Sequence, residues 1–164
     1  MRYILIIFFI FLFSLTVISC SKKDDSSSSS SAAGTYQLAT NDYANGVATD
    51  SSGNVYVTGG TKGGLDGNTS AGNTDLFVVK YNSSGTKQWT KQLGSSGLDS
   101  ANGITIDSSG NVYVTGVTFG GLDWNTSAGA NDLFVVKYNS SGTKQWTKQL
   151  GTSTGDFARG VATD

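Results

Sequence analysis

The sequence DSSGNVYVTG stands twice in this chain, as Asp50–Gly59 and again as Asp107–Gly116. Aspartate, serine and glycine at its start favour a tight turn, and the valine and tyrosine that follow favour a β-strand. The repetition extends well beyond these ten residues, because residues 42–98 and 99–155 differ at 12 of 57 positions and are identical at the other 45. The chain is therefore built on a 57-residue repeat.

Two partial units flank the full ones. Residues 156–164 match the opening of the repeat, and residues 35–38 resemble residues 90–93, which end a unit. The sequence thus predicts a repeat region over 35–164. It would consist of a strand remnant at 35–41, repeat 1 at 42–98, repeat 2 at 99–155, and the first strand of a third repeat at 156–164.

Each full unit is punctuated by turns. In repeat 1 we expect strands over 46–49, 54–59, 75–81 and 86–93, with turns at 50–53 and 82–85 and a long loop at 63–72. Both turns place Asp or Asn three residues before Gly, so the side chain can accept hydrogen bonds from the turn amides while Gly adopts a positive φ. The unit is predicted to be a four-stranded antiparallel meander.

The third strand decides how the units pack. Residues 76–79 read LFVV, so both faces of the sheet are apolar there and both must be covered. Like sheets stacked face to face cover one another, which predicts β-propeller blades rather than a β-solenoid, whose coils are shorter. Propellers use about four to eight blades. Two full blades with partial strands make an incomplete ring, for which we expect marginal stability.

The repeat also resembles a known family. Residues 103–116, GITIDSSGNVYVTG, together with DLFVVKY at 132–138 and TKQW at 143–146, are similar to the SBBP-type β-propeller repeat. The resemblance implies a many-bladed propeller of the kind found in bacterial surface and secreted proteins, often lipoproteins. It implies no common activity, and this sequence departs from the family in having too few units for a ring.

Composition narrows the chemistry. The chain has no His, and all 12 acidic residues are Asp. Without His or Glu, a serine nucleophile lacks its usual base and a metal lacks its commonest ligand, so we expect no enzyme. A net charge of −1 gives no long-range attraction to nucleic acid, and no nucleic-acid partner is expected.

Residues 1–20 have the layout of a secretory signal. Arg2 precedes an apolar run from Tyr3 to Ile18, and residues 17–20, VISC, resemble the lipobox of bacterial lipoproteins. The resemblance implies lipidation of Cys20, the only cysteine, and so no internal disulfide. A short membrane-spanning helix is the alternative, since about 17 apolar residues suffice to span a bilayer.

Residues 21–34, SKKDDSSSSSSAAG, are predicted to be a flexible tether, because they offer no apolar surface whose burial would offset ordering. Ser21 directly after the cysteine, and the charged residues that follow, resemble lipoproteins sent to the outer membrane or cell surface. We therefore expect an exported protein, lipid-anchored in the bacterial cell envelope.

The long loops hold candidate oxygen ligands at alternate positions, as calcium loops do. The expected bidentate Glu is missing, because Phe77 and Phe134 stand in its place. A surface loop whose side chains cap its own backbone is therefore favoured, with no cofactor, and calcium remains the alternative. The candidate ligands are Asp66, Asn68, Asp75, Asp123, Asn125 and Asp132.

Two aromatic residues break the repeat. Trp124 stands where repeat 1 has Gly67, and Phe119 where it has Lys62. Residues that depart from the repeat are free of its packing, so this loop is a candidate ligand-contact surface. The recurring Trp89 and Trp146 are instead expected to pack between blades.

The leading functional prediction is a cell-envelope lipoprotein whose repeats form a non-catalytic binding or scaffolding surface for a protein or glycan. One alternative is a fragment of a longer propeller with no independent function. A propeller-type lyase or hydrolase is a further alternative, disfavoured by the missing His and Glu. Unpaired blades also predict self-association.

Overall fold

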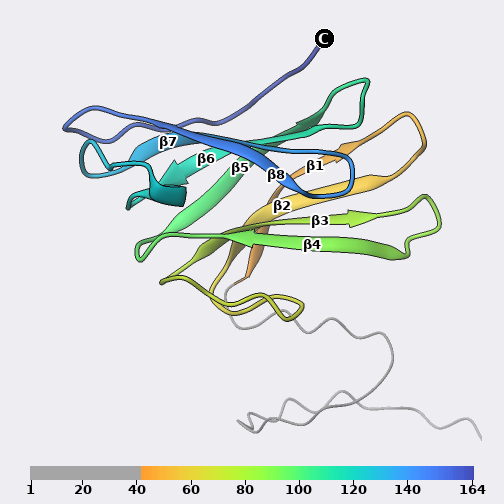
Figure 1. Cartoon of the computed structure of the whole chain (residues 1–164), viewed down its shortest axis with the longest axis horizontal. Helices are drawn as coiled ribbons and strands as arrows, with labels where there is room; N and C mark the ends of the chain where they lie inside the picture. The colour runs from red at the N-terminus through yellow and green to blue at the C-terminus, as the bar shows by residue number, and fades with distance from the viewer. Residues whose placement is uncertain (1–41) are drawn as a thin grey trace, which may run out of the picture. The chain divides into compact units, whose positions relative to one another are not determined.

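The structure, a computed structural model, describes residues 42–164. The predicted signal peptide, Cys20, the tether and the strand remnant at 35–41 lie outside these residues. Two four-stranded antiparallel sheets, ordered β1-β2-β3-β4 and β5-β6-β7-β8, make up the described part (Figure 1). The first consists of β1 (Tyr43–Thr49), β2 (Val55–Thr61), β3 (Asp75–Tyr81) and β4 (Lys87–Leu93). The second consists of β5 (Asp99–Ile106), β6 (Val112–Thr118), β7 (Asp132–Tyr138) and β8 (Lys144–Leu150).

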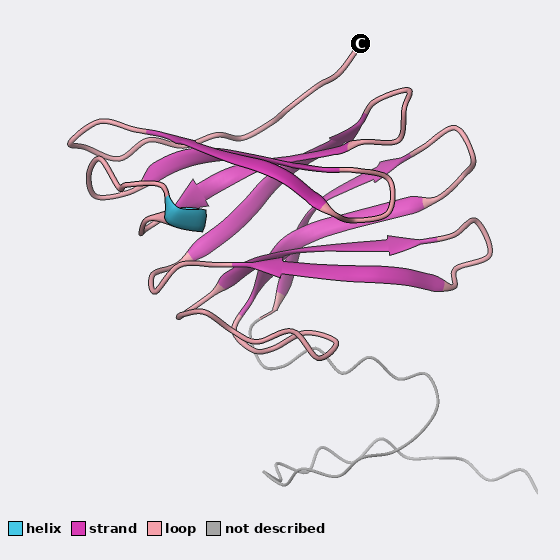
Figure 2. Ribbon diagram, in the orientation of Figure 1, coloured by secondary structure: helices cyan, strands magenta, loops and turns pink. Residues whose placement is uncertain are grey.

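Each sheet is a meander in which consecutive strands pair, so the predicted all-β fold class of propeller-like blades is confirmed. The one helical element among the described residues is a 3₁₀ turn, η1 (Leu122–Trp124), in the loop between β6 and β7 (Figure 2). The sheets do not close into a ring within residues 42–164.

The first strand is longer than the sequence predicts, because it begins at Tyr43 rather than Gly46. A β-bulge between Ala44 and Gly46 shifts the register and hides the strand's alternation. The bulge brings the Tyr43 carbonyl against Gly59, and a Cβ at that position would collide with it. Gly59 is therefore required by a close backbone approach.

The DSSG turns have the predicted chemistry. The Gly53 amide donates to the Asp50 carbonyl at 3.0 Å, the Ser52 amide donates to Asp50 Oδ1 at 3.0 Å, and Gly53 has φ = 76°. The Asn82 turn repeats this arrangement, with Gly85 at φ = 80°. Aspartate caps one turn and asparagine the other, and glycine supplies the left-handed residue in both.

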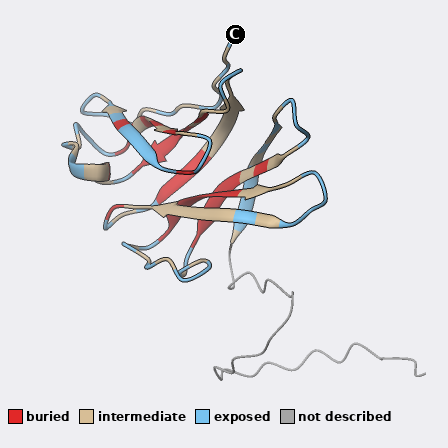
Figure 3. Ribbon diagram, turned by 45° about the vertical axis from the view of Figure 1, so that its right-hand side comes forward, coloured by how far each residue is buried: buried red, intermediate tan, exposed pale blue. Residues whose placement is uncertain are grey.

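The core lies between the two sheets, which pack face to face (Figure 3). Tyr56, Leu76 and Val78 of the first sheet are fully buried against the second. Trp89 packs on this core and meets Tyr56 edge-on, with ring centroids 6.0 Å apart, as predicted. Trp146, for which the same packing was predicted, is 38% exposed on the second sheet. The second sheet contributes Ala101, Val112, Val114, Phe134, Val136 and Tyr138.

Residues 156–164 form no strand, contrary to prediction. They run beside β5, where Asn102 Nδ2 donates to the Ala158 carbonyl at 2.9 Å and Thr163 Oγ1 donates to the Ile106 carbonyl at 3.1 Å. A strand needs a ladder partner, and the equivalent of β2 for a third unit is not present among residues 42–164. The segment thus has the position of a first strand without its ladder.

Within residues 42–164 no helix has the length and apolar character needed to traverse a bilayer.

Candidate functional site

The candidate site is the loop between β6 and β7, which carries both repeat-breaking aromatics. Leu122 anchors the loop, because its side chain is fully buried in the space between the sheets. Asn125 closes the 3₁₀ turn, donating from its backbone N at 3.1 Å and from Nδ2 at 2.8 Å to the Leu122 carbonyl. The loop is therefore fixed at its centre while its tip faces solvent.

Gln149 on β8 holds the same loop in place through its side-chain hydrogen bonds. Its Oε1 accepts the Leu122 amide at 2.8 Å, and its Nε2 donates to the Gly120 carbonyl at 3.0 Å and to Asp132 Oδ2 at 2.6 Å. Gln92 makes the corresponding bonds in the first sheet, to Leu65 and Gly63 among others. Sequence reasoning missed these glutamines, although their recurrence 57 residues apart in the repeat was visible.

Trp124 is the most exposed large apolar residue of the loop, with its side chain 100% accessible and a backbone φ of 67°. Its counterpart Gly67 has φ = 80°, so this loop position requires the left-handed region in both units. A bulky residue held there costs about 1–2 kcal/mol relative to glycine. Packing contacts do not offset that cost, because the Trp124 side chain is fully exposed to solvent.

A hollow of about 290 Å³ lies beside Trp124. Its walls come from both blades, with Leu93 and Gly94 at the end of β4 and Gly121 and Asp123 in the loop. Phe119 is 48% exposed on the same loop but is not among the residues that line the hollow. The predicted aromatic pair is thus exposed as expected, with only Trp124 beside a concave surface.

Asp123 supplies a fixed charge at the rim of this hollow. Partial burial favours its neutral form, but an ion pair with Lys144 Nζ prevails and lowers the pKa of its carboxyl group. Asp66 forms the corresponding ion pair with Lys87, the first residue of β4, and this pair lowers the pKa of the Asp66 carboxyl group. The rim therefore offers a carboxylate and an ammonium group that are already paired.

The calcium candidates have other partners. Asp66 and Asp123 form these ion pairs, and Asn68 Nδ2 donates to the Leu65 carbonyl at 2.7 Å. Asp75 Oδ2 accepts the Ala71 amide at 2.8 Å, while its Oδ1 is buried without a hydrogen-bond partner. Among residues 42–164, no three acidic or thiolate side chains gather as a metal site would require. Some of these side chains cap the loop backbone and others pair with lysines, and calcium binding stays a prediction.

A buried aspartate that the sequence did not single out joins the two sheets. Asp99, at the start of β5, accepts bonds from the Ser95 amide at 2.6 Å and from Thr118 Oγ1, and its own amide donates to the Thr74 carbonyl at 2.7 Å. Burial raises the pKa of Asp99, and the nearby charge of Asp75 adds to the effect. Such a group organises the junction between the two blades.

The two stacked four-stranded antiparallel sheets have the form of β-propeller blades. A family model described as a beta-propeller repeat, SBBP, matches residues 37–66 and 88–123, so these parts of the chain are similar to that repeat.

The chain is also similar to two longer proteins. It is 28% identical over 128 residues to the regulatory protein FlaEY of Caulobacter vibrioides, a match covering 70% of this chain and 13% of that protein. It is 30% identical over 119 residues to the uncharacterised WD repeat-containing protein L264 of Acanthamoeba polyphaga mimivirus, covering 62% of this chain and 8% of that protein. The chain thus spans a small part of each relative.

Proposed function

We propose that the chain is a cell-envelope lipoprotein, anchored through Cys20, that presents its blades as a non-catalytic binding surface for a protein or glycan. The β-propeller repeats and the names of the relatives, a regulatory protein and a WD repeat-containing protein, fit a binding or scaffolding role. The absence of His and Glu from the sequence supports a role without catalysis.

One observation carries the proposal. Trp124 is fully exposed in a backbone conformation that glycine adopts more readily, and the first unit uses Gly67 at that place. Strained residues that packing does not require are found at ligand-binding positions, and tryptophan is the residue most enriched at binding hot spots. The adjoining hollow, lined by Leu93 and by Asp123, gives a ligand both an apolar face and a polar group.

The chain provides its own control for a test. The double variant Phe119→Lys with Trp124→Gly restores the residues of the first loop at both positions, leaving the blade core untouched. A glycan array probed with the full chain and this variant tests the glycan arm. For the protein arm, a photo-crosslinking amino acid is placed at position 124 in cells, and at position 67 as the control.

The proposal expects a ligand that binds the wild-type chain, or crosslinks at position 124, and is lost in the variant or absent at position 67. Equal binding by the variant, equal crosslinking at both positions, or no ligand in either arm would contradict it.

A further inference from the structure

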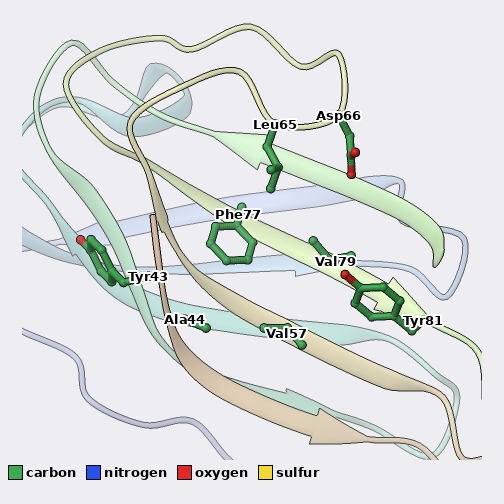
Figure 4. Close-up of a pocket in the computed structure, with 8 residues that line it drawn as sticks. All are labelled: Tyr43, Ala44, Val57, Leu65, Asp66, Phe77, Val79 and Tyr81. Carbon is green, nitrogen blue, oxygen red and sulfur yellow. The ribbon is translucent and has the colours of Figure 1, made fainter. Parts of the chain in front are cut away.

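The outward face of the first sheet carries an apolar groove. It has a volume of about 170 Å³ and its lining is drawn in Figure 4. Phe77 and Val79 of β3 form its floor, flanked by Val57 of β2 and Tyr81, and Leu65 overhangs it from the long loop. No described part of the chain fills the groove.

The second blade uses the same residue types in a filled version of this groove. Val114, Leu122 and Phe134 correspond to Val57, Leu65 and Phe77, and all three are 0% exposed because the first sheet covers them. Val136 and Tyr138, which correspond to Val79 and Tyr81, are 0% and 3% exposed. In the open groove Val57, Leu65 and Tyr81 are half-buried, while Phe77 and Val79 at its floor are only 5% and 6% exposed. The groove is therefore a partly open copy of an interface that the chain makes with itself.

The surface that fills such a groove is also available a second time. Tyr56, Leu76 and Val78 fill the second blade's groove and are 0% exposed. Their counterparts on the outer face of the second sheet are Tyr113, Leu133 and Val135, which are only half-buried, and Leu150 is 69% exposed. The outer face of the second sheet thus presents three protruding residues, here called the knobs (Tyr113, Leu133 and Val135). The outer face of the first sheet presents the groove.

The hydrogen bonds that join the first strand of one unit to the next unit also repeat along the chain. Asn45 Nδ2 donates to the Ala101 carbonyl at 2.9 Å, and Asn102 Nδ2 donates to the Ala158 carbonyl at 2.9 Å. Residues 156–164 match residues 42–50 at seven of nine positions, differing at Phe157 and Arg159. The segment that lies on β5 therefore has the sequence of β1, yet it lacks the ladder that holds β1 in its sheet.

We propose that this chain assembles head to tail with a second copy of itself, whose first blade docks on the outer face of the second blade. β1 of the incoming copy takes the place of residues 156–164, which lie along β5 of that blade. This contact is heterologous, so each docked copy leaves the same face open for the next one. The inference goes beyond the proposed ligand binding and does not depend on it.

Sedimentation of the full chain in a mild non-ionic detergent tests the proposal. The wild-type chain is expected to show a concentration-dependent mass. Deletion of residues 156–164 removes the competitor of β1, so assemblies should form at lower protein concentration. Leu133→Lys places a charge among the knobs and should raise the concentration needed by about tenfold or more.

The control is Thr126→Lys, which adds the same charge on the exposed β6–β7 loop and should leave the assembly unchanged. Circular dichroism establishes that each variant keeps its strands. A chain that stays monomeric at all concentrations with and without residues 156–164 would overturn the proposal. So would assemblies that Leu133→Lys and Thr126→Lys affect equally, because these would be non-specific.

Discussion

The ring of Tyr43 lies over Gly60 on the paired strand, and a Cβ at Gly60 would come within 2.7 Å of the ring. In the second blade the equivalent pair is Ser100 opposite Val117. The first blade thus has the larger residue of the pair on its first strand, and the second blade has the larger residue on its second strand. Cross-strand neighbours of this kind share one volume.

This pair predicts a coupled effect on stability. Gly60→Val alone should lower the free energy of unfolding by about 1–3 kcal/mol, since the added methyl groups meet the Tyr43 ring. Adding Tyr43→Ser, which recreates the pair of the second blade, should restore most of the loss. Urea denaturation of the single and double variants measures the coupling, and additive effects of the two changes would contradict it.

Trp124→Gly should stabilise the fold. Glycine removes the cost of about 1–2 kcal/mol for a bulky residue at positive φ. Its greater freedom in the unfolded chain lowers the stability by about 0.4–1 kcal/mol, which offsets part of this gain. A net gain of about 0.5–1 kcal/mol is expected by thermal or urea denaturation. Gly67→Trp is the matched reverse change and should destabilise the first loop by a similar amount. A loss of stability in Trp124→Gly would show that the indole makes a stabilising contact.

Gln149→Ala should free the β6–β7 loop. It removes the partners of the Leu122 amide, the Gly120 carbonyl and one oxygen of Asp132, at an expected cost of about 2–3 kcal/mol. Hydrogen exchange of the Leu122 amide should accelerate with the loss of stability. Gln145→Ala is the control, because Gln145 lies on the same strand and donates only to the Thr143 carbonyl. Equal effects at both positions would refute the pinning role.

The raised pKa of Asp99 predicts a pH effect of definite sign. Folded Asp99 keeps its proton at a pH where the unfolded chain, near the ordinary value of 3.8, has released it. Its contribution to stability is therefore fully present below that value and is lost as the pH rises through the folded pKa. Comparing wild type with Asp99→Asn removes the titration of this group while the other aspartates stay in place.

Relative to wild type, Asp99→Asn should gain stability as the pH rises from below the ordinary value of 3.8 through the raised pKa of Asp99, because the asparagine carries no charge to bury. Urea denaturation at several pH values measures the difference. A difference that stays constant over this interval would exclude Asp99 as the titrating group.

Cys20→Ala should release the protein from membranes if the cysteine carries acyl chains, because two buried chains hold a protein stably and the variant has neither. Fractionation of cells into membrane and soluble parts measures this. Retention of the variant in the membrane fraction would favour the alternative of a spanning segment in residues 3–18.

The sequence predicted the blades well, because their turn residues and strand alternation are local and repeat in register. It placed the start of β1 three residues late, because the bulge between Ala44 and Gly46 interrupts the alternation. It predicted a strand at 156–164, since the residues match β1, but a ladder depends on a partner that residue types alone do not supply.

The candidate site was predictable only in part. The replacement of Gly67 by Trp124 was visible as a break in the repeat, and its exposure followed from that. The hollow beside it was not, because it joins Leu93 of one blade to Asp123 of the next, a contact between residues distant in sequence. The roles of Gln149 and Asp99 likewise depend on tertiary neighbours.

The attachment of each long loop to the last strand of its own blade, through Gln92 in one and Gln149 in the other, has an evolutionary consequence. A unit duplicated or lost by recombination carries its loop and the loop's support together, so its neighbours keep theirs. A substitution at a loop tip such as position 124 therefore leaves this support in place.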